Sequence, residues 1–189
     1  MAVQLAKKNV SVSLAKSLNN VLIGLGWDTA SNGGYEFDLD ASVFLVGPNG
    51  KVTEDEDFVF YNNLIHPSKS VEHTGDNRTG LGDGDDESIR VDLGKVPSHI
   101  DKLVITVTIH DAQRRAQNFG QVSNAFIRLV DESTGSEVLR YDLAETFSVE
   151  TTLVFAEVYR TSRGWDFVAK GEGSIGDLFD LCVRYGVNV

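Results

Sequence analysis

The chain has 189 residues, with 41% hydrophobic and 24% charged, which suits one folded domain and argues against disorder. Its formal net charge of -11 disfavours nucleic acid and anionic membrane as direct partners, because their phosphates would be repelled. The single cysteine, Cys182, excludes an intramolecular disulfide and fits a reducing compartment. We find no signal peptide and no membrane-spanning run, so we expect one cytoplasmic domain over residues 1–189 with no membrane insertion.

In the first half of the chain, apolar and polar residues alternate with a period of two, as in half-buried strands. We predict that residues 10–14 and 21–25 form a strand pair. Residues 37–45 form a third strand, ended by the turn signal Asn49-Gly50, and residues 58–64 form another.

The second half continues the same alternation, most clearly over residues 103–109. Residues 89–93 are a further strand, and two hairpins follow. The hairpins join residues 125–130 to 137–143 and residues 152–160 to 165–169. Many short strands with Gly- and Asn-rich turns predict an all-β fold, a β-sandwich of two mostly antiparallel sheets.

The end of the chain breaks the pattern and predicts a C-terminal α-helix packed on the sandwich. Ser174 would cap the helix and Gly186 would end it. A short helical turn is also predicted within residues 114–121. The apolar residues spaced as one helix face are Ile175, Leu178, Phe179, Cys182 and Val183. On that face Cys182 would be a small buried hydrophobe, not a redox thiol.

Residues 66–88 form the least regular stretch and contain an acidic loop at residues 76–87. Crowded carboxylates repel one another, and interleaved glycines make ordering costly, so a cation is needed to order such a loop. Calcium takes six to eight oxygen ligands of the kind found here. The candidate ligands in the loop are Asp76, Asn77, Asp83, Asp85, Asp86 and Glu87.

The loop is not an EF-hand, because Arg78 and Leu81 stand where that pattern requires an oxygen ligand and a glycine. A solvated acidic loop is the alternative interpretation of this segment. Asp38 and Asp40 lie two residues apart on a predicted strand, so both leave the same face. Together with Asp28 they could supply the other half of a metal site, if these strand ends lie beside the acidic loop. Asp111, after His110, is a weaker candidate for the same end.

Several motifs resemble the TerD family, and the resemblance spans nearly the whole chain. They are GLGWD at 24–28, FDLDAS at 37–42, FVFYNN at 58–63, GDNRTG at 75–80, GDGDDE at 82–87, IHDA at 109–112, NFGQV at 118–122, RYDL at 140–143 and EVYR at 157–160.

This resemblance implies a bacterial cytoplasmic protein of the tellurium-resistance and general stress system, a calcium-binding β-sandwich. It implies more than one Ca²⁺ ion and a binding or scaffold role, with other proteins of the same gene cluster as partners, at the inner membrane surface. Carried over by position, the metal residues are Asp28, Asp38, Asp40, Asp76, Asn77, Asp83, Asp85, Asp86 and Glu87.

Two other classes of function stay open. A metal-dependent hydrolase could use the carboxylates, although no catalytic motif with supporting spacing is present. A calcium-dependent phospholipid-binding module of the C2 type would need a basic or apolar patch beside the metal loops, and Arg78 is the only cation within the acidic motif. We interpret His73 and His110 as hydrogen-bonding residues and not as zinc ligands, because oxygen donors dominate. We expect no catalytic activity.

Overall fold

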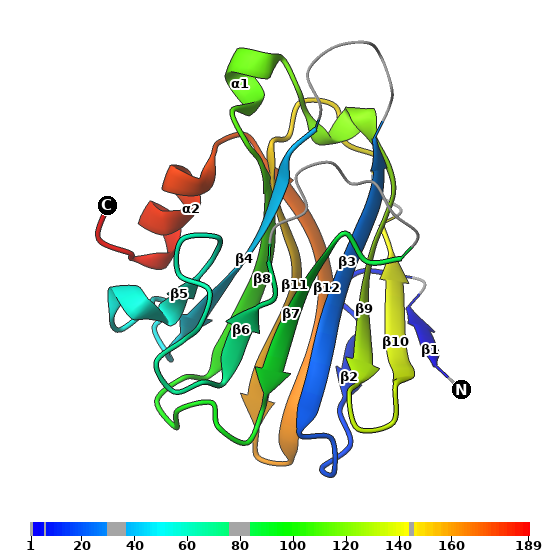
Figure 1. Cartoon of the computed structure of the whole chain (residues 1–189), viewed down its shortest axis with the longest axis vertical. Coiled ribbons are helices and arrows are strands. Elements are labelled where there is room, and N and C mark those ends of the chain that lie inside the picture. Colours follow the sequence, from blue (N-terminus) through cyan, green and yellow to red (C-terminus); the bar gives the residue numbers. More distant parts are fainter. Residues whose placement is uncertain (1, 6, 30–36, 76–83, 144–145) are drawn as a thin grey trace.

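The computed structural model describes residues 2–5, 7–29, 37–75, 84–143 and 146–189. Two six-stranded sheets pack face to face, and a helix lies against the outside of one of them (Figure 1). The first sheet contains, in spatial order, β1 (Val3–Leu5), β10 (Ser136–Asp142), β9 (Val122–Asp131), β3 (Asn20–Thr29), β7 (Glu87–Asp92) and β6 (Val71–His73). The second contains β2 (Ser11–Ser13), β12 (Gly164–Ser174), β11 (Thr152–Thr161), β8 (Lys102–Ile109), β4 (Leu39–Val46) and β5 (Phe58–Val59).

Neighbouring strands are antiparallel except β1 and β10, which pair in parallel. The predicted β-sandwich is therefore confirmed. Both predicted hairpins, β9–β10 and β11–β12, are also confirmed by their registers. The remaining elements are short: η1 (Asp55–Asp57), α1 (Ala112–Arg115), η2 (Phe119–Gln121) and α2 (Leu178–Tyr185).

One predicted strand pairing is wrong. Residues 10–14 and 21–25 give β2 and β3, but β2 pairs with β12 in the second sheet and β3 pairs with β7 and β9 in the first. Alternation shows that a strand has one buried face, and it does not show which neighbour completes the sheet. The predicted strand 58–64 ends early, at Val59, where Phe60 and Asn63 close a turn. The strands β1 and β6 were not predicted from the sequence.

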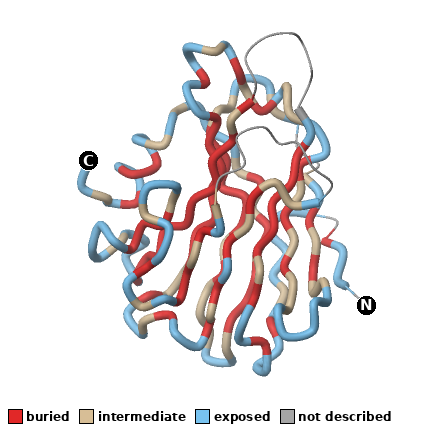
Figure 2. Tube along the Cα trace, in the orientation of Figure 1, coloured by how far each residue is buried: buried red, intermediate tan, exposed pale blue. Residues whose placement is uncertain are grey.

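The main core lies between the two sheets, where buried residues run along the middle of the strands (Figure 2). Val21, Ile23 and Leu25 of β3 face Ile105 and Val107 of β8 within one apolar cluster, and all five are almost fully buried. Burial of this apolar surface is the main stabilising contribution to the fold.

A second core lies on the outer side of β4. All eight residues of β4 are buried: one face meets the inter-sheet core, and on the other face Phe44 and Val46 cluster with residues of α2. Phe44 stacks on Phe58 with ring centroids 4.4 Å apart and contacts Tyr185 of α2 at 4.6 Å. The C-terminal helix therefore packs on the sandwich as predicted.

The predicted boundaries and buried face of this helix need correction. Asp177 caps α2 in place of Ser174, whereas Gly186 ends it with φ of 81° as predicted. The helix buries Leu181, Cys182 and Tyr185 and leaves Phe179 and Val183 exposed. The helix carries two neighbouring apolar stripes, one with Phe179 and Val183 and one with Leu181 and Tyr185. The contact between Tyr185 and Phe44 decides which stripe faces the sandwich. Within the described residues no helix is long and apolar enough to cross a membrane.

Candidate metal centre

Strand ends from both sheets meet at one end of the sandwich, near α1 and η2 (Figure 1). In the first sheet Leu25 lies opposite Glu87, and Asp28 lies opposite Ser123. In the second sheet Leu39, which begins β4, lies opposite Ile109, which ends β8. Among the described residues, the strand ends that carry Asp28 and Asp40 therefore lie at the same end of the sandwich as the start of β7, as expected.

Asp28, Asp85 and Asp86 form the first group of carboxylates. Asp86 Oδ2 accepts a hydrogen bond from Trp27 N at 2.8 Å, and Asp86 N donates to Leu25 O at 2.7 Å. Burial raises the pKa of Asp86, the hydrogen bond from Trp27 opposes this, and the charges of Asp28 and Asp85 raise it further. Asp86 is therefore held among like charges in a partly desolvated position, where a cation would be stabilised.

Asp85 is held by an arginine that the sequence analysis missed. Arg128 of β9 donates from Nε to Asp85 Oδ1 at 2.8 Å and from Nη2 to Oδ2 at 3.0 Å. The carboxylate lies over Gly24, where an added Cβ would stand 2.1 Å from Oδ2. The glycine therefore allows the bidentate pair to form. The only sequence signal for Arg128 was its position between the buried Ile127 and Leu129, which turns it away from the core.

Glu87 is buried and points across to the other sheet. Its Oε2 accepts a hydrogen bond from Ala41 N of β4 at 2.6 Å. β5 pairs with β4 only at Val43 and Phe44, so Glu87 bonds to the edge of β4 beyond that ladder. His73 Nε2 lies 3.4 Å from the same oxygen, and its Nδ1 accepts from Gly75 N at 3.2 Å. His73 is thus a buried hydrogen-bonding residue.

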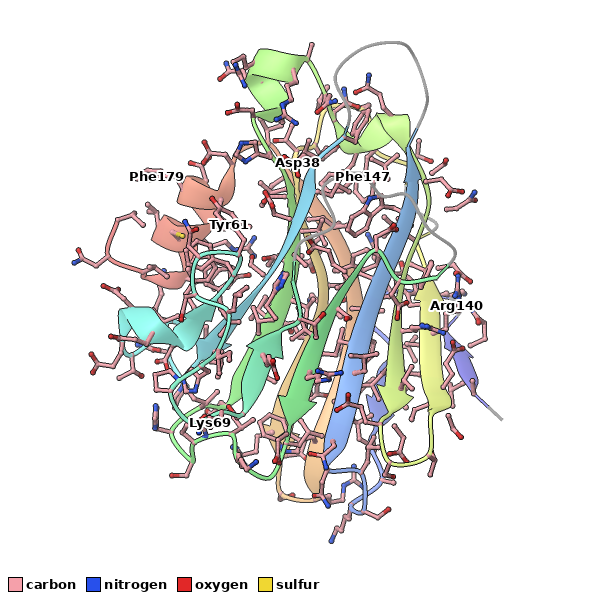
Figure 3. All side chains as sticks on the ribbon, in the orientation of Figure 1. Asp38, Tyr61, Lys69, Arg140, Phe147 and Phe179 are labelled. Atoms are coloured by element: carbon pink, nitrogen blue, oxygen red, sulfur yellow. The ribbon has the colours of Figure 1, made fainter. Side chains whose placement is uncertain are left out.

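Asp38 and Asp40 form a second group, at the start of β4; Figure 3 labels Asp38. Asp38 Oδ2 lies 3.7 Å from Arg115 Nη2, at the end of α1. Asp40 Oδ2 lies 3.7 Å from His110 Nδ1, which is half exposed. Asp111 lies 3.9 Å from the other ring nitrogen of His110 and pairs with Arg114. Cationic side chains around α1 therefore offset part of this group's charge.

Three predicted ligands, Asp76, Asn77 and Asp83, lie outside the described residues. Among the residues that are described, no three His, Cys, Asp or Glu side chains are grouped as a metal site. Asp28, Asp85 and Asp86 offer carboxylate oxygens, and this type of donor suits a hard cation such as Ca²⁺. The assignment of a metal to these residues stays a prediction.

A row of three side chains elsewhere has the order of a hydrolytic triad. Asp57 Oδ1 lies 3.0 Å from His66 Nε2, and His66 Nδ1 lies 2.7 Å from Ser68 Oγ. Ser68 N also donates to His66 Nδ1 at 3.1 Å, and Ser70 N donates to Ser68 Oγ at 3.2 Å. Because backbone N–H groups of the same turn bond to these side-chain atoms, we interpret the three residues as stabilising the turn and not as a catalytic triad.

The chain is similar to known proteins in both sequence and structure. The model of the TerD domain matches residues 1–185. The chain is 57% identical to tellurium resistance protein TerD of Serratia marcescens, covering 100% of this chain and 99% of that one. It is 50% identical to general stress protein 16U of Bacillus subtilis over the full length of both. A crystal structure of a TerD homologue from Streptomyces coelicolor has the same fold, with a TM-score of 0.71 at 22% identity over 87% of this chain and 95% of that one.

Proposed function

The chain belongs to the TerD family of tellurium-resistance and stress-response proteins, and on this premise we propose that it binds calcium and serves as a binding or scaffold component of that response. The observation that supports calcium binding most strongly is the position of Asp86. This carboxylate is partly desolvated beside Asp28 and Asp85, and its pKa is raised first by burial and then by their charges. A divalent cation would relieve both costs at once.

The described carboxylates divide into two roles in this proposal. Asp28 and Asp86 supply oxygens to the cation, together with Asp76, Asn77 and Asp83 of the acidic loop. Asp85 is held by Arg128 through both carboxylate oxygens, and Glu87 accepts a hydrogen bond from Ala41 N through Oε2. These contacts favour a structural role for Asp85 and Glu87, in which Asp85 anchors the acidic loop to β9 and Glu87 anchors it to β4. Asp38 and Asp40 are candidates for a second ion.

Direct chemistry on tellurite is disfavoured by the charge and the thiol. The net charge of -11 repels an oxyanion. Cys182 is buried, and burial, followed by the charges of Asp177 and Asp55, raises its pKa to about 11. A thiol this rarely ionised is a poor nucleophile and reductant. We therefore propose an indirect, cytoplasmic role among other proteins of the resistance system.

Calcium titration calorimetry tests the metal assignment. We expect heat of binding for the wild type and a loss of affinity of about tenfold or more when Asp28→Asn and Asp86→Asn are combined. Asp131→Asn is the matched control, because Asp131 lies at the other end of the β3–β9 ladder, about 20 Å from Asp28. Unchanged affinity in the double variant would place the calcium site elsewhere.

A second assay separates a binding protein from an enzyme. Phosphatase and esterase substrates are offered with calcium, manganese and zinc. The proposal expects no turnover above that of the metal alone. Turnover that disappears in the Asp28→Asn and Asp86→Asn variant would instead assign a metal-dependent hydrolase.

A further inference from the structure

The outer face of α2 carries an apolar stripe that the sandwich does not cover. Ile175, Phe179 and Val183 are 74%, 57% and 55% exposed. Phe179 and Val183 lie one helical turn apart on α2, and Ile175 precedes the N-cap residue Asp177. Figure 3 labels Phe179 on the side of α2 that faces away from the strands. Contiguous exposed apolar surface of this kind marks interaction sites.

The stripe leads into a groove between α1 and the start of α2. The groove has a volume of about 520 Å³, and Val149, which is 55% exposed, lines it together with Ile175. Two lining residues are tied to each other, because Thr151 Oγ1 donates to Gly176 O at 2.5 Å and accepts from Gly176 N at 3.0 Å. These bonds hold the segment before α2 against the start of β11, which lowers the entropic cost of binding there.

Acidic side chains line the groove. Asp111, Asp177 and Asp180 contribute carboxylates, and Arg114, the one cation among the described lining residues, is paired with Asp111. Asp177 and Asp180 are bonded to each other's backbone N–H groups as a capping box. In the described part of the chain no Lys or Arg pairs with either of them. The surface thus combines apolar side chains with uncompensated negative charge.

We propose that this face, formed by Ile175, Phe179, Val183 and the groove beside them, binds a basic amphipathic segment of a partner protein. A helix laid along the stripe would bury apolar side chains at spacings of three and four residues, and its Lys or Arg residues would meet Asp177 and Asp180. The inference gives a surface to the binding role proposed above, and it does not depend on calcium.

Charge favours a basic segment at this face over two other binding partners, a second copy of the chain and an anionic membrane. A second copy of the chain docked through the same face would bring its own Asp177 and Asp180 against this pair, with net charges of -11 on both sides. An anionic membrane surface would be repelled for the same reason. A basic protein segment is the partner whose charge complements Asp177 and Asp180.

The probe is a fluorescent helical peptide with leucines on one face and lysines on the other, compared with a scrambled peptide of the same composition. Anisotropy is measured in chelator and in calcium. We expect the ordered peptide to bind in both, and Ile175→Ser with Phe179→Ser to weaken it roughly tenfold or more. Asp177→Asn with Asp180→Asn, which keeps a good helix cap, should weaken it and reduce its salt dependence.

Two controls locate the effect. Val10→Ser changes an apolar residue of 44% exposure on another part of the surface, and Asp131→Asn removes one distant charge; both should bind like the wild type. Equal binding of the scrambled peptide, or equal weakening by the controls, would overturn the proposal. So would a dimer in sedimentation velocity that Phe179→Ser dissociates, or binding of phosphatidylglycerol vesicles through this face. Because the assay runs in chelator, its failure leaves the calcium proposal standing, and failure of calcium binding leaves this one standing.

Discussion

Glu87 Oε2 and Ala41 N lie 2.6 Å apart, and this hydrogen bond joins the first residue of β7 in one sheet to β4 in the other. The carboxylate is buried, and the same oxygen faces His73. The last residue of the acidic loop is therefore part of the contact that holds the two sheets together at the candidate metal centre.

Removing this carboxylate should destabilise the fold. We expect Glu87→Ala to lower the free energy of unfolding by about 3 kcal/mol, because buried polar partners lose their acceptor. Glu87→Gln keeps an oxygen for Ala41 N and should cost about 1 kcal/mol. Urea unfolding in chelator measures both without a contribution from calcium.

The matched control for Glu87 is Glu132→Ala. Glu132 accepts a hydrogen bond from Arg90 Nε at 2.8 Å, and the arginine side chain is half exposed. Such a surface pair contributes about 0–1 kcal/mol. A cost for Glu87→Ala no greater than that of Glu132→Ala would show that the inter-sheet bond contributes little.

Gly24→Ala should displace Asp85 from Arg128. The new Cβ would stand 2.1 Å from Asp85 Oδ2, so the carboxylate must leave its bidentate position. We expect a loss of about 1–3 kcal/mol in the free energy of unfolding. In a double-mutant cycle, adding Asp85→Ala should relieve most of the cost of Gly24→Ala. Costs that simply add would mean that the two residues do not interact.

The raised pKa of Asp86 gives a pH dependence with a defined sign. The folded state holds this proton more tightly than the unfolded state, where the ordinary value is 3.8. Ionised Asp86 therefore costs stability above its folded pKa, and the cost disappears as the pH falls through that pKa toward 3.8. In chelator, Asp86→Asn should be more stable than the wild type at neutral pH, and the difference should shrink on acidification.

The same titration should weaken calcium binding at low pH, because a proton competes with the cation for Asp86. Chemical denaturation of both proteins across this range, with calcium titrations beside it, provides the measurement. An advantage of Asp86→Asn that grows on acidification would contradict the assignment of the shift.

Cys182 should be unreactive in the folded protein. With a pKa of about 11, only about one thiol in a thousand is ionised at pH 8. We expect iodoacetamide to label the native chain at least about a hundredfold more slowly than the chain in urea, as followed by mass spectrometry. Rapid labelling of the native chain would reopen a redox role for this residue.

The sequence predicted the parts of the fold that depend on local pattern. The alternation in residues 103–109 gave β8, and both hairpins followed from short turns between two alternating runs. It could not pair β2 with β12, because the two are separated by most of the chain and alternation carries no partner information. It also misplaced the buried face of α2, since Phe179 and Tyr185 are both apolar and only the contact with Phe44 decides between them.

The same limit applies to the site. Composition and spacing identified the acidic residues, and the strand ends bring the charges of Asp28 and Asp85 close enough to act on Asp86, but metal binding by these residues stays a prediction. The partners of these residues, Arg128 for Asp85 and Ala41 for Glu87, come from strands far away in the chain. Pairwise contacts of this kind depend on the register between strands, which a single sequence does not specify.

Thermal unfolding in calcium and in chelator tests the central claim most directly. A cation that binds only the folded state raises its stability by about 2.7 kcal/mol at a hundred times the dissociation constant. For a domain of this size that corresponds to a rise of roughly 5–10 °C in the midpoint. We predict this rise for the wild type and for Asp131→Asn, and its loss when Asp28→Asn and Asp86→Asn are combined. The same midpoint for the wild type in saturating calcium and in chelator would contradict the account.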